Sequence, residues 1–171
     1  MRRLVQLLCL FGFSALFLMG CSAQRGASSP SASSWKNGVK GVWTLTSIEK
    51  DNFPNGASVK NIFDEAPMEC FQNSEWNLTA SGKGTITFSE AGTSCAPGAV
   101  RELFWSIFKE KDLHDAYFQF KKIMPGDKAK DVTAGYRLEL VSAMDGTMVM
   151  RMPIDAGGAS TSYLIFNFSQ Y

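Results

Sequence analysis

A single histidine limits the acid–base chemistry that this chain could perform. His114 lies in the polar stretch 111–115, which has the composition of a hairpin tip. Any Ser-His-Asp or Cys-His arrangement would have to use this imidazole, and no Gly-x-Ser-x-Gly motif accompanies it. We expect His114 to be a solvated loop residue and not a catalytic base.

The acidic residues could in principle supply the carboxylate pair of a glycoside hydrolase. They fall mainly in expected loops, as Asp64, Glu65 and Asp112 do, or at outward strand positions such as Glu139. Solvated surface charge explains them, and one histidine without a thiol cluster does not supply the ligands of a zinc site. We therefore predict no catalytic residues, no metal and no cofactor, in a protein that is not an enzyme.

Cys21 is the residue whose surroundings indicate chemistry most directly. Two arginines at the N-terminus precede an almost unbroken apolar run over 4–19, and Gly20 stands before Cys21. This pattern resembles the lipobox of bacterial lipoproteins. The resemblance implies that 1–20 is a signal peptide and that Cys21 is acylated, for example with palmitate. Several acyl chains make a stable membrane anchor, whereas a single chain is marginal.

Two other interpretations of this segment stay open. A spanning helix is one, although it needs about 20 apolar residues and this run is shorter. Ordinary secretory cleavage after Ala23 is the other. In Gram-negative lipoproteins an Asp after the acylated Cys often signals inner-membrane retention. Ser22 stands here, so the resemblance implies the outer membrane, and the lack of an acidic cluster after Cys21 favours its periplasmic side.

A further pair of cysteines is expected to form a disulfide. Cys9 would leave with the signal peptide and Cys21 would be acylated, so Cys70 and Cys95 remain. The periplasm is oxidising, which favours their pairing. Closing a loop of this length would contribute about 3.5 kcal/mol by the chain-entropy estimate. Two buried free thiols are the alternative.

Composition excludes some classes of protein. Hydrophobic residues make up 45% of the chain and there are 13 Phe, which excludes a disordered protein. Removing Arg2 and Arg3 from the 17 basic residues leaves 15, against 16 acidic ones, and the lysines are scattered. Nucleic-acid binding needs a concentrated cationic surface. We predict no nucleic-acid partner.

The chain is expected to divide into three parts. After the signal peptide, 21–40 is predicted to be a lipidated flexible tether, because 22–34 is rich in Ser, Ala and Gly and offers almost nothing to bury. The remaining range, 41–171, fits one domain with a substantial core.

This domain has the pattern of a β-protein. Alternating apolar and polar residues and two hairpin turns, at 81–84 and at Asp145-Gly146, separate the expected strands. A long connection covers 51–68, with one helical turn over 59–63. The strands are predicted over 41–50, 70–78, 85–88, 102–109, 116–123, 136–142, 147–152 and 162–168.

Strands joined by short turns must be antiparallel, because a parallel return needs a crossover of a dozen residues or more. A meander of eight such strands would leave two unpaired edges, and closure removes both. The predicted fold is therefore all-β, an eight-stranded antiparallel up-and-down barrel. A two-sheet sandwich is the alternative.

The start of the first strand carries a short motif. Gly41-Val42-Trp43 resembles the Gly-x-Trp that opens lipocalins, and with the lipobox the chain resembles bacterial lipocalin-like domain lipoproteins. The resemblance covers roughly 41–171. It implies that Gly41 and Trp43 close one end of the barrel and that a late arginine, Arg137 or Arg151, stacks on the Trp.

Apolar side chains recur at strand period and indicate either a core or a pocket. Methionine adapts to varied apolar shapes, whereas an eight-stranded barrel is narrow enough to be filled by its own side chains. The candidate ligand-binding residues are Trp105, Phe118, Phe120, Met148 and Met150.

Two functions are consistent with these observations. The first is a membrane-anchored lipocalin-like lipoprotein that binds a small hydrophobic ligand. The second is a non-catalytic accessory or structural outer-membrane lipoprotein that acts through protein–protein contacts with a partner that the sequence does not identify.

Overall fold

The structure is a computed structural model that describes residues 29–110 and 115–170. Its strands form one closed antiparallel barrel in the order β1 to β8, which confirms the predicted fold class. The elements, in chain order, are α1 (Ala32–Val39), β1 (Gly41–Asp51), α2 (Met68–Phe71), β2 (Glu75–Leu78), β3 (Lys83–Thr87), β4 (Val100–Lys109), β5 (Ala116–Ile123), β6 (Tyr136–Met144), β7 (Thr147–Ile154) and β8 (Ser162–Ser169).

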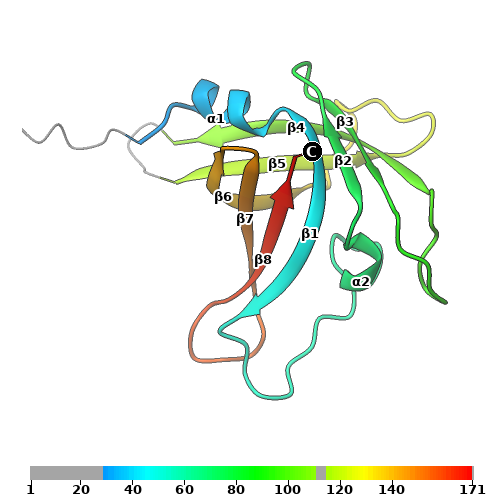
Figure 1. Cartoon of the computed structure of the whole chain (residues 1–171), viewed down its shortest axis with the longest axis vertical. Helices are drawn as coiled ribbons and strands as arrows, with labels where there is room; N and C mark the ends of the chain where they lie inside the picture. Colours follow the sequence, from blue (N-terminus) through cyan, green and yellow to red (C-terminus); the bar gives the residue numbers. More distant parts are fainter. Residues whose placement is uncertain (1–28, 111–114, 171) are drawn as a thin grey trace, which may run out of the picture.

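Pairing between the first and last strands closes the barrel. β1 and β8 are antiparallel, with a register that runs from Thr44 opposite Ser169 to Asp51 opposite Tyr163. Figure 1 shows these two strands side by side, while β4 and β5 run across them on another side of the barrel. Each strand is therefore paired on both sides, and the sheet has no open edge.

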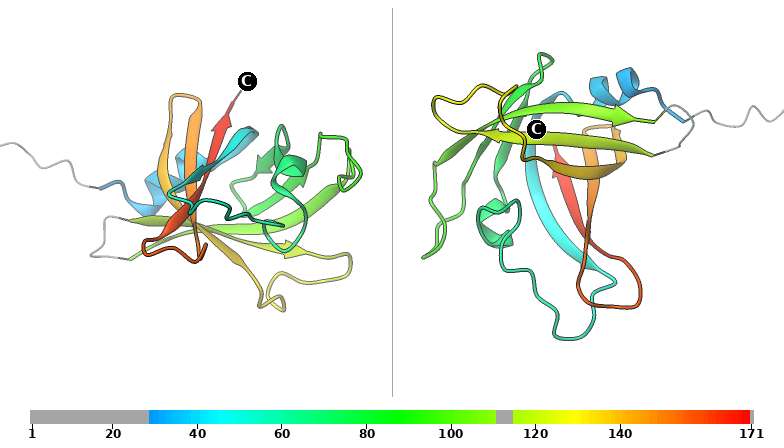
Figure 2. Two further views of the ribbon diagram at one scale, coloured as in Figure 1. Left: turned by 90° about the horizontal axis from the view of Figure 1, so that it is seen from below. Right: turned by 180° about the vertical axis from the view of Figure 1, so that it is seen from behind.

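The two ends of the barrel are built differently (Figures 1 and 2). At one end, here called the closed end, short turns join β2 to β3 and β6 to β7, and α1 packs near β4 and β6. At the other end, here called the mouth, longer loops cover 52–67, 88–99, 124–135 and 155–161. Strand alternation places one side of every strand in the interior, as the burial pattern of β8 illustrates.

Helix α1 corrects the expected extent of the tether. Ala32–Val39 is helical within the range predicted as flexible, and the Ser31 hydroxyl caps it by accepting from the Ser34 N–H at 3.1 Å. Trp35 and Val39 stand four residues apart and pack against the core, because that spacing puts them on one face of the helix. The folded unit therefore begins before Gly41. In the described part of the chain, no helix is long and apolar enough to cross a membrane.

The connection after β1 also differs from expectation. The stretch 70–78, predicted as one strand, is divided into α2 and β2, and Asn73 with φ of 57° makes the bend between them. No helical turn forms over 59–63. Ile62 instead bridges to Ala66, with Phe63 and Asp64 in the left-handed region of backbone conformation. Burial of Phe63 overrides the local helical pattern, as described below.

Candidate functional site

The closed end is sealed by the residues of the Gly-x-Trp motif. Trp43 is buried, and its Nε1–H donates to the carbonyl oxygen of Val39 at the end of α1, at 2.8 Å. Gly41 has φ of 148°, and a Cβ there would lie 2.5 Å from the Gln170 side chain. The positive φ favours glycine at this position, so the motif determines both the turn from α1 into β1 and the position of the Trp43 ring.

Neither candidate arginine stacks on Trp43. The Arg137 guanidinium lies 5.2 Å from the ring centroids of Phe108 and Tyr117. Arg151 lies 4.6 Å from the ring of Tyr163. Both arginines belong to strand positions whose side chains face outward, so this expectation from the lipocalin resemblance is wrong.

The candidate ligand-binding residues all lie inside the barrel, where the alternation pattern put them. All are buried, and the rings of Phe118 and Phe120 pack on each other and on those of Trp105 and Trp76. Met148 and Met150 are fully buried in the same core. The structure therefore brings these residues together as packed interior, with the chain's own side chains occupying the space between them.

Phe63 fills the mouth of the barrel. It comes from the 52–67 loop, and its side chain is only 3% exposed. Five aromatic rings surround it and form what we call the ring box; their centroids lie 5.0 to 6.1 Å from that of Phe63, and they belong to Phe71, Trp76, Phe120, Tyr136 and Phe166. Edge-to-face pairs dominate, which is the favourable geometry for aromatic rings. A single loop side chain thus acts as the plug.

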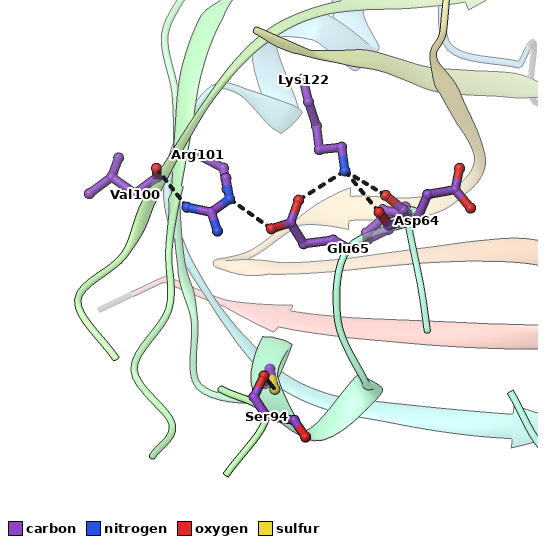
Figure 3. Close-up of polar contacts among 8 residues, drawn as sticks. Asp64, Glu65, Ser94, Val100, Arg101 and Lys122 are labelled. Carbon is purple, nitrogen blue, oxygen red and sulfur yellow. Dashed lines mark hydrogen bonds and ion pairs between the residues drawn. The ribbon is translucent and has the colours of Figure 1, made fainter. Parts of the chain in front are cut away.

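Charged and polar side chains hold this loop across the mouth (Figure 3). We call them the clamp; they are Asp64, Glu65, Arg101, Lys122 and Tyr136. Glu65 accepts from Arg101 Nε at 2.8 Å and from Lys122 Nζ at 2.9 Å. Lys122 also donates to the carbonyl oxygen of Phe63 at 2.8 Å, and the Tyr136 hydroxyl donates to Asp64 Oδ2 at 3.2 Å. The expectation that Glu65 is a solvated surface charge is therefore wrong.

The electrostatics of this clamp favour an ionised carboxylate. Burial raises the pKa of Glu65, but the hydrogen bonds and charges of Lys122 and Arg101 outweigh burial, so that the pKa lies below its ordinary value. Burial raises the pKa of Tyr136, and the nearby Asp64 carboxylate adds to that increase, while Lys122 opposes it. Tyr136 accordingly stays a neutral hydrogen-bond donor at neutral pH.

The clamp is strong enough to position the loop but contributes modestly to stability. The side chains of Arg101, Glu65 and Lys122 are 34%, 18% and 21% exposed, and partly exposed ion pairs typically contribute about 0.2–1 kcal/mol each. Opposing them, Phe63 and Asp64 hold φ of 53° and 47°, which costs about 1 kcal/mol or more per non-glycine residue. Burial of the Phe63 ring is therefore the main term that keeps the loop closed.

The predicted disulfide forms one wall of the mouth. Cys70 and Cys95 are bonded, with Cα atoms 5.2 Å apart. This bond ties α2 to the 88–99 loop, and the α2 residue Phe71 contacts both Phe63 and Phe88. The disulfide therefore holds α2, and with it one wall of the mouth, against the 88–99 loop.

The plug and its clamp are residues that sequence reasoning missed. Phe63, Arg101 and Lys122 were not expected to form a site, and the signal available was weak. Ile62 and Phe63 are adjacent large apolar residues in a long connection that contains many polar ones, and such a pair is usually buried. The sequence does not say where, because the partners come from β4, β5, β6 and β8.

The predicted signal peptide over 1–20 and the residues Cys21, Asp112 and His114 lie outside the described ranges. Across 29–110 and 115–170, no group of three or more His, Cys, Asp or Glu residues is arranged to hold a metal ion. Comparisons of the chain with protein-family models, with curated proteins and with solved structures each gave no significant match.

Proposed function

We propose that this chain is a lipid-anchored, non-catalytic lipoprotein of the bacterial cell envelope, a lipocalin-like barrel that binds a small apolar ligand containing a ring. The lipobox-like segment ending at Cys21 supports the anchor at the outer membrane. The ring box supports the ligand: five aromatic side chains surround a sixth that a loop supplies.

Ligand entry requires Phe63 to leave the ring box. The ligand ring would then take over the aromatic contacts of Phe63, and the strained backbone of Phe63 and Asp64 would relax. The apparent affinity is lowered by the small fraction of molecules in which the loop is open, so weakening the clamp should strengthen binding. A planar apolar molecule matches the ring box better than a flexible alkyl chain does, because the ring box surrounds the planar ring of Phe63 in the closed conformation.

The test uses the Cys21→Ser chain, which carries no acyl group, so that the probe does not partition into detergent. Bromobenzene quenches tryptophan fluorescence, and the Trp76 ring lies 6.1 Å from that of Phe63. We expect saturable quenching, with Glu65→Gln binding about fivefold more tightly, since its ion pairs with Arg101 and Lys122 together contribute about 1 kcal/mol.

The matched control is Glu139→Gln, which removes the ion pair between Glu139 and Arg151 on the outside of the barrel. It should leave the affinity for bromobenzene unchanged. The ligand proposal would be contradicted if quenching were non-saturable both in the chain that carries only Cys21→Ser and in the chain that also carries Glu65→Gln. Binding by Phe63→Ala alone would also contradict it, because that variant contains an artificial cavity.

The anchor has its own test. Cells that express the full chain should incorporate radioactive palmitate into it, and Cys21→Ser should abolish the label. Equal labelling of both chains would contradict acylation at Cys21.

An accessory role through protein contacts is the second candidate, and two observations favour it. The interior is packed with the chain's own side chains in the closed conformation. On the outside, Phe104 and Phe108 of β4 are 39% and 41% exposed. Exposed aromatic side chains on a sheet face are typical of contact surfaces.

A further inference from the structure

The outer face of β4, β5 and β6 carries a hollow of about 590 Å³, which we call the outer groove. Phe104 contributes one wall, and Gln119 and Lys121 of β5 form part of its floor. Arg137 lines it from β6, and Lys130 lines it from the 124–135 loop. This groove lies outside the barrel and is separate from the ring box, although Phe120 and Tyr136 border both.

The charged residues that line the outer groove are cationic. They are Lys121, Lys130 and Arg137, and no carboxylate is among the described residues of its walls, although Lys130 Nζ lies 4.0 Å from the exposed Asp131 carboxylate next to the groove. Basic and acidic residues are nearly equal in number over the whole chain, so three cations in one hollow are a local concentration. A groove of this kind favours a negatively charged occupant.

Two of these cations are held in place by the fold. With the Gln119 amide oriented so that its oxygen accepts, Arg137 Nε and Nη2 donate to it at 2.8 and 2.6 Å, and the guanidinium stacks on Phe108 and Tyr117. Lys121 Nζ donates to the carbonyl oxygen of Val132 at 2.6 Å and so fixes the 124–135 loop that forms one wall. The groove is therefore preformed, which lowers the entropy cost of binding.

An exposed ring stands between this groove and a second one. A hollow of about 420 Å³ over β2 to β5 also includes Phe104 and Ala129, so the two hollows adjoin at these residues. The second hollow is mixed in charge, because Lys83, Glu102 and Asp127 all line it. The combined surface suits an elongated occupant that is acidic at one end and places an apolar group beside Phe104.

We propose that the outer groove binds an acidic, extended segment of a partner protein, with an apolar side chain of that segment packed on Phe104. Arginine and aromatic residues together are enriched among the residues that dominate protein–protein binding energy. Because the closed barrel offers no strand edge to extend, the segment is recognised through side chains. The inference rests on the accessory role proposed above and is independent of a ligand inside the barrel.

The test is a selection of phage-displayed random 12-residue peptides on the full chain carrying Cys21→Ser. An excess of the same chain with Phe104→Ala and Lys130→Glu serves as competitor. We expect peptides rich in Asp and Glu with one aromatic or large aliphatic residue. Bound as fluorescent synthetic peptides, they should lose about tenfold in affinity with either Phe104→Ala or Lys130→Glu, the loss expected of a residue central to an interface.

Lys60→Glu is the control, because Lys60 is an exposed cation of the 52–67 loop that does not line the groove. Equal weakening by Lys60→Glu and Lys130→Glu would overturn the proposal, since it would indicate attraction to net charge alone. The proposal would also be overturned if the selected peptides lacked acidic residues, or if no peptide bound the chain in preference to the competitor variant. A third outcome would overturn it as well: Lys130→Glu abolishes binding to phosphatidylglycerol vesicles but leaves peptide binding unaffected. In that case a lipid surface, and not a peptide, would occupy the groove.

Discussion

The two ends of the barrel are closed by different physical means. At the closed end, Trp43 is fixed by a buried hydrogen bond to α1, and Gly41 adopts a positive φ that other residues rarely adopt. At the mouth, a ring on a long loop is held mainly by its burial among other rings, with ion pairs at the protein surface added, and is opposed by backbone strain at Phe63. The comparison predicts that the closed end opens only with the fold, whereas the mouth opens alone.

Trp43→Ala should have the largest effect, because it removes a fully packed side chain and leaves the Val39 carbonyl without its donor. We expect a loss of about 4 kcal/mol in the free energy of unfolding. Chemical denaturation measures it. A loss below about 1 kcal/mol would show that this end is not closed by the Trp.

Removing the disulfide should be the next largest change. Cys70→Ser with Cys95→Ser is expected to lower the free energy of unfolding by about 3 kcal/mol, because the unfolded chain regains the freedom of an open loop. The same double variant should loosen α2 and the wall of the mouth that it forms. An unchanged thermal midpoint under oxidising conditions would contradict this role.

Phe63→Ala should destabilise the protein less than removal of an equivalent ring on a strand. We expect a loss of about 2 kcal/mol, because relief of strain and collapse of the loop offset part of the cavity term. Phe166→Ala, in the same ring box but on β8, should cost about 4 kcal/mol. If Phe63→Ala and Phe166→Ala lowered the free energy of unfolding equally, Phe63 would be an ordinary core residue and not a separately movable plug.

Glu65→Gln should have the smallest effect, about 1 kcal/mol at pH 7. Since Lys122 and Arg101 hold the folded pKa of Glu65 below its ordinary value of 4.5, the carboxylate stabilises the fold above that pH and less as pH falls through the folded pKa. The difference between Glu65→Gln and the unsubstituted protein should therefore shrink in acid. A difference that stays constant from pH 7 to pH 3 would contradict the clamp.

The sequence predicted the barrel well because its signals are local. Alternation along the strands and the Asp145-Gly146 turn determine the strand order, and Ala116–Ile123 has the predicted bounds. The pairing of Cys70 with Cys95 was predicted by setting aside Cys9 and Cys21 and by expecting an oxidising compartment, and the structure confirms the pairing. The strands and turns depend on neighbours in the chain. Closure between β1 and β8 is not local, and it was predicted because an open meander would leave two unpaired edges.

The site could not be predicted because its members are distant in sequence. Glu65 meets Arg101 and Lys122 only after β4 and β5 pair. The predicted helical turn over 59–63 was wrong for the same reason, because burial of Phe63 among rings from other elements outweighs the local preference for a helix. Helix α1 was not predicted because Trp35 and Val39 directly follow the Ser-rich stretch. They form an apolar face only in a helix, and that helix is stabilised by packing on the end of the barrel, which lies far away in the sequence.

Hydrogen exchange measured by mass spectrometry tests most directly whether the mouth opens by itself. The Ile62 and Glu65 amides, which donate within the 52–67 loop, should exchange about 100-fold faster than β1 amides around Trp43, because loop opening requires far less free energy than unfolding. Glu65→Gln should accelerate exchange in the loop and leave β1 unchanged. Equal protection at both ends, or equal acceleration of both by Glu65→Gln, would contradict a separately opening mouth.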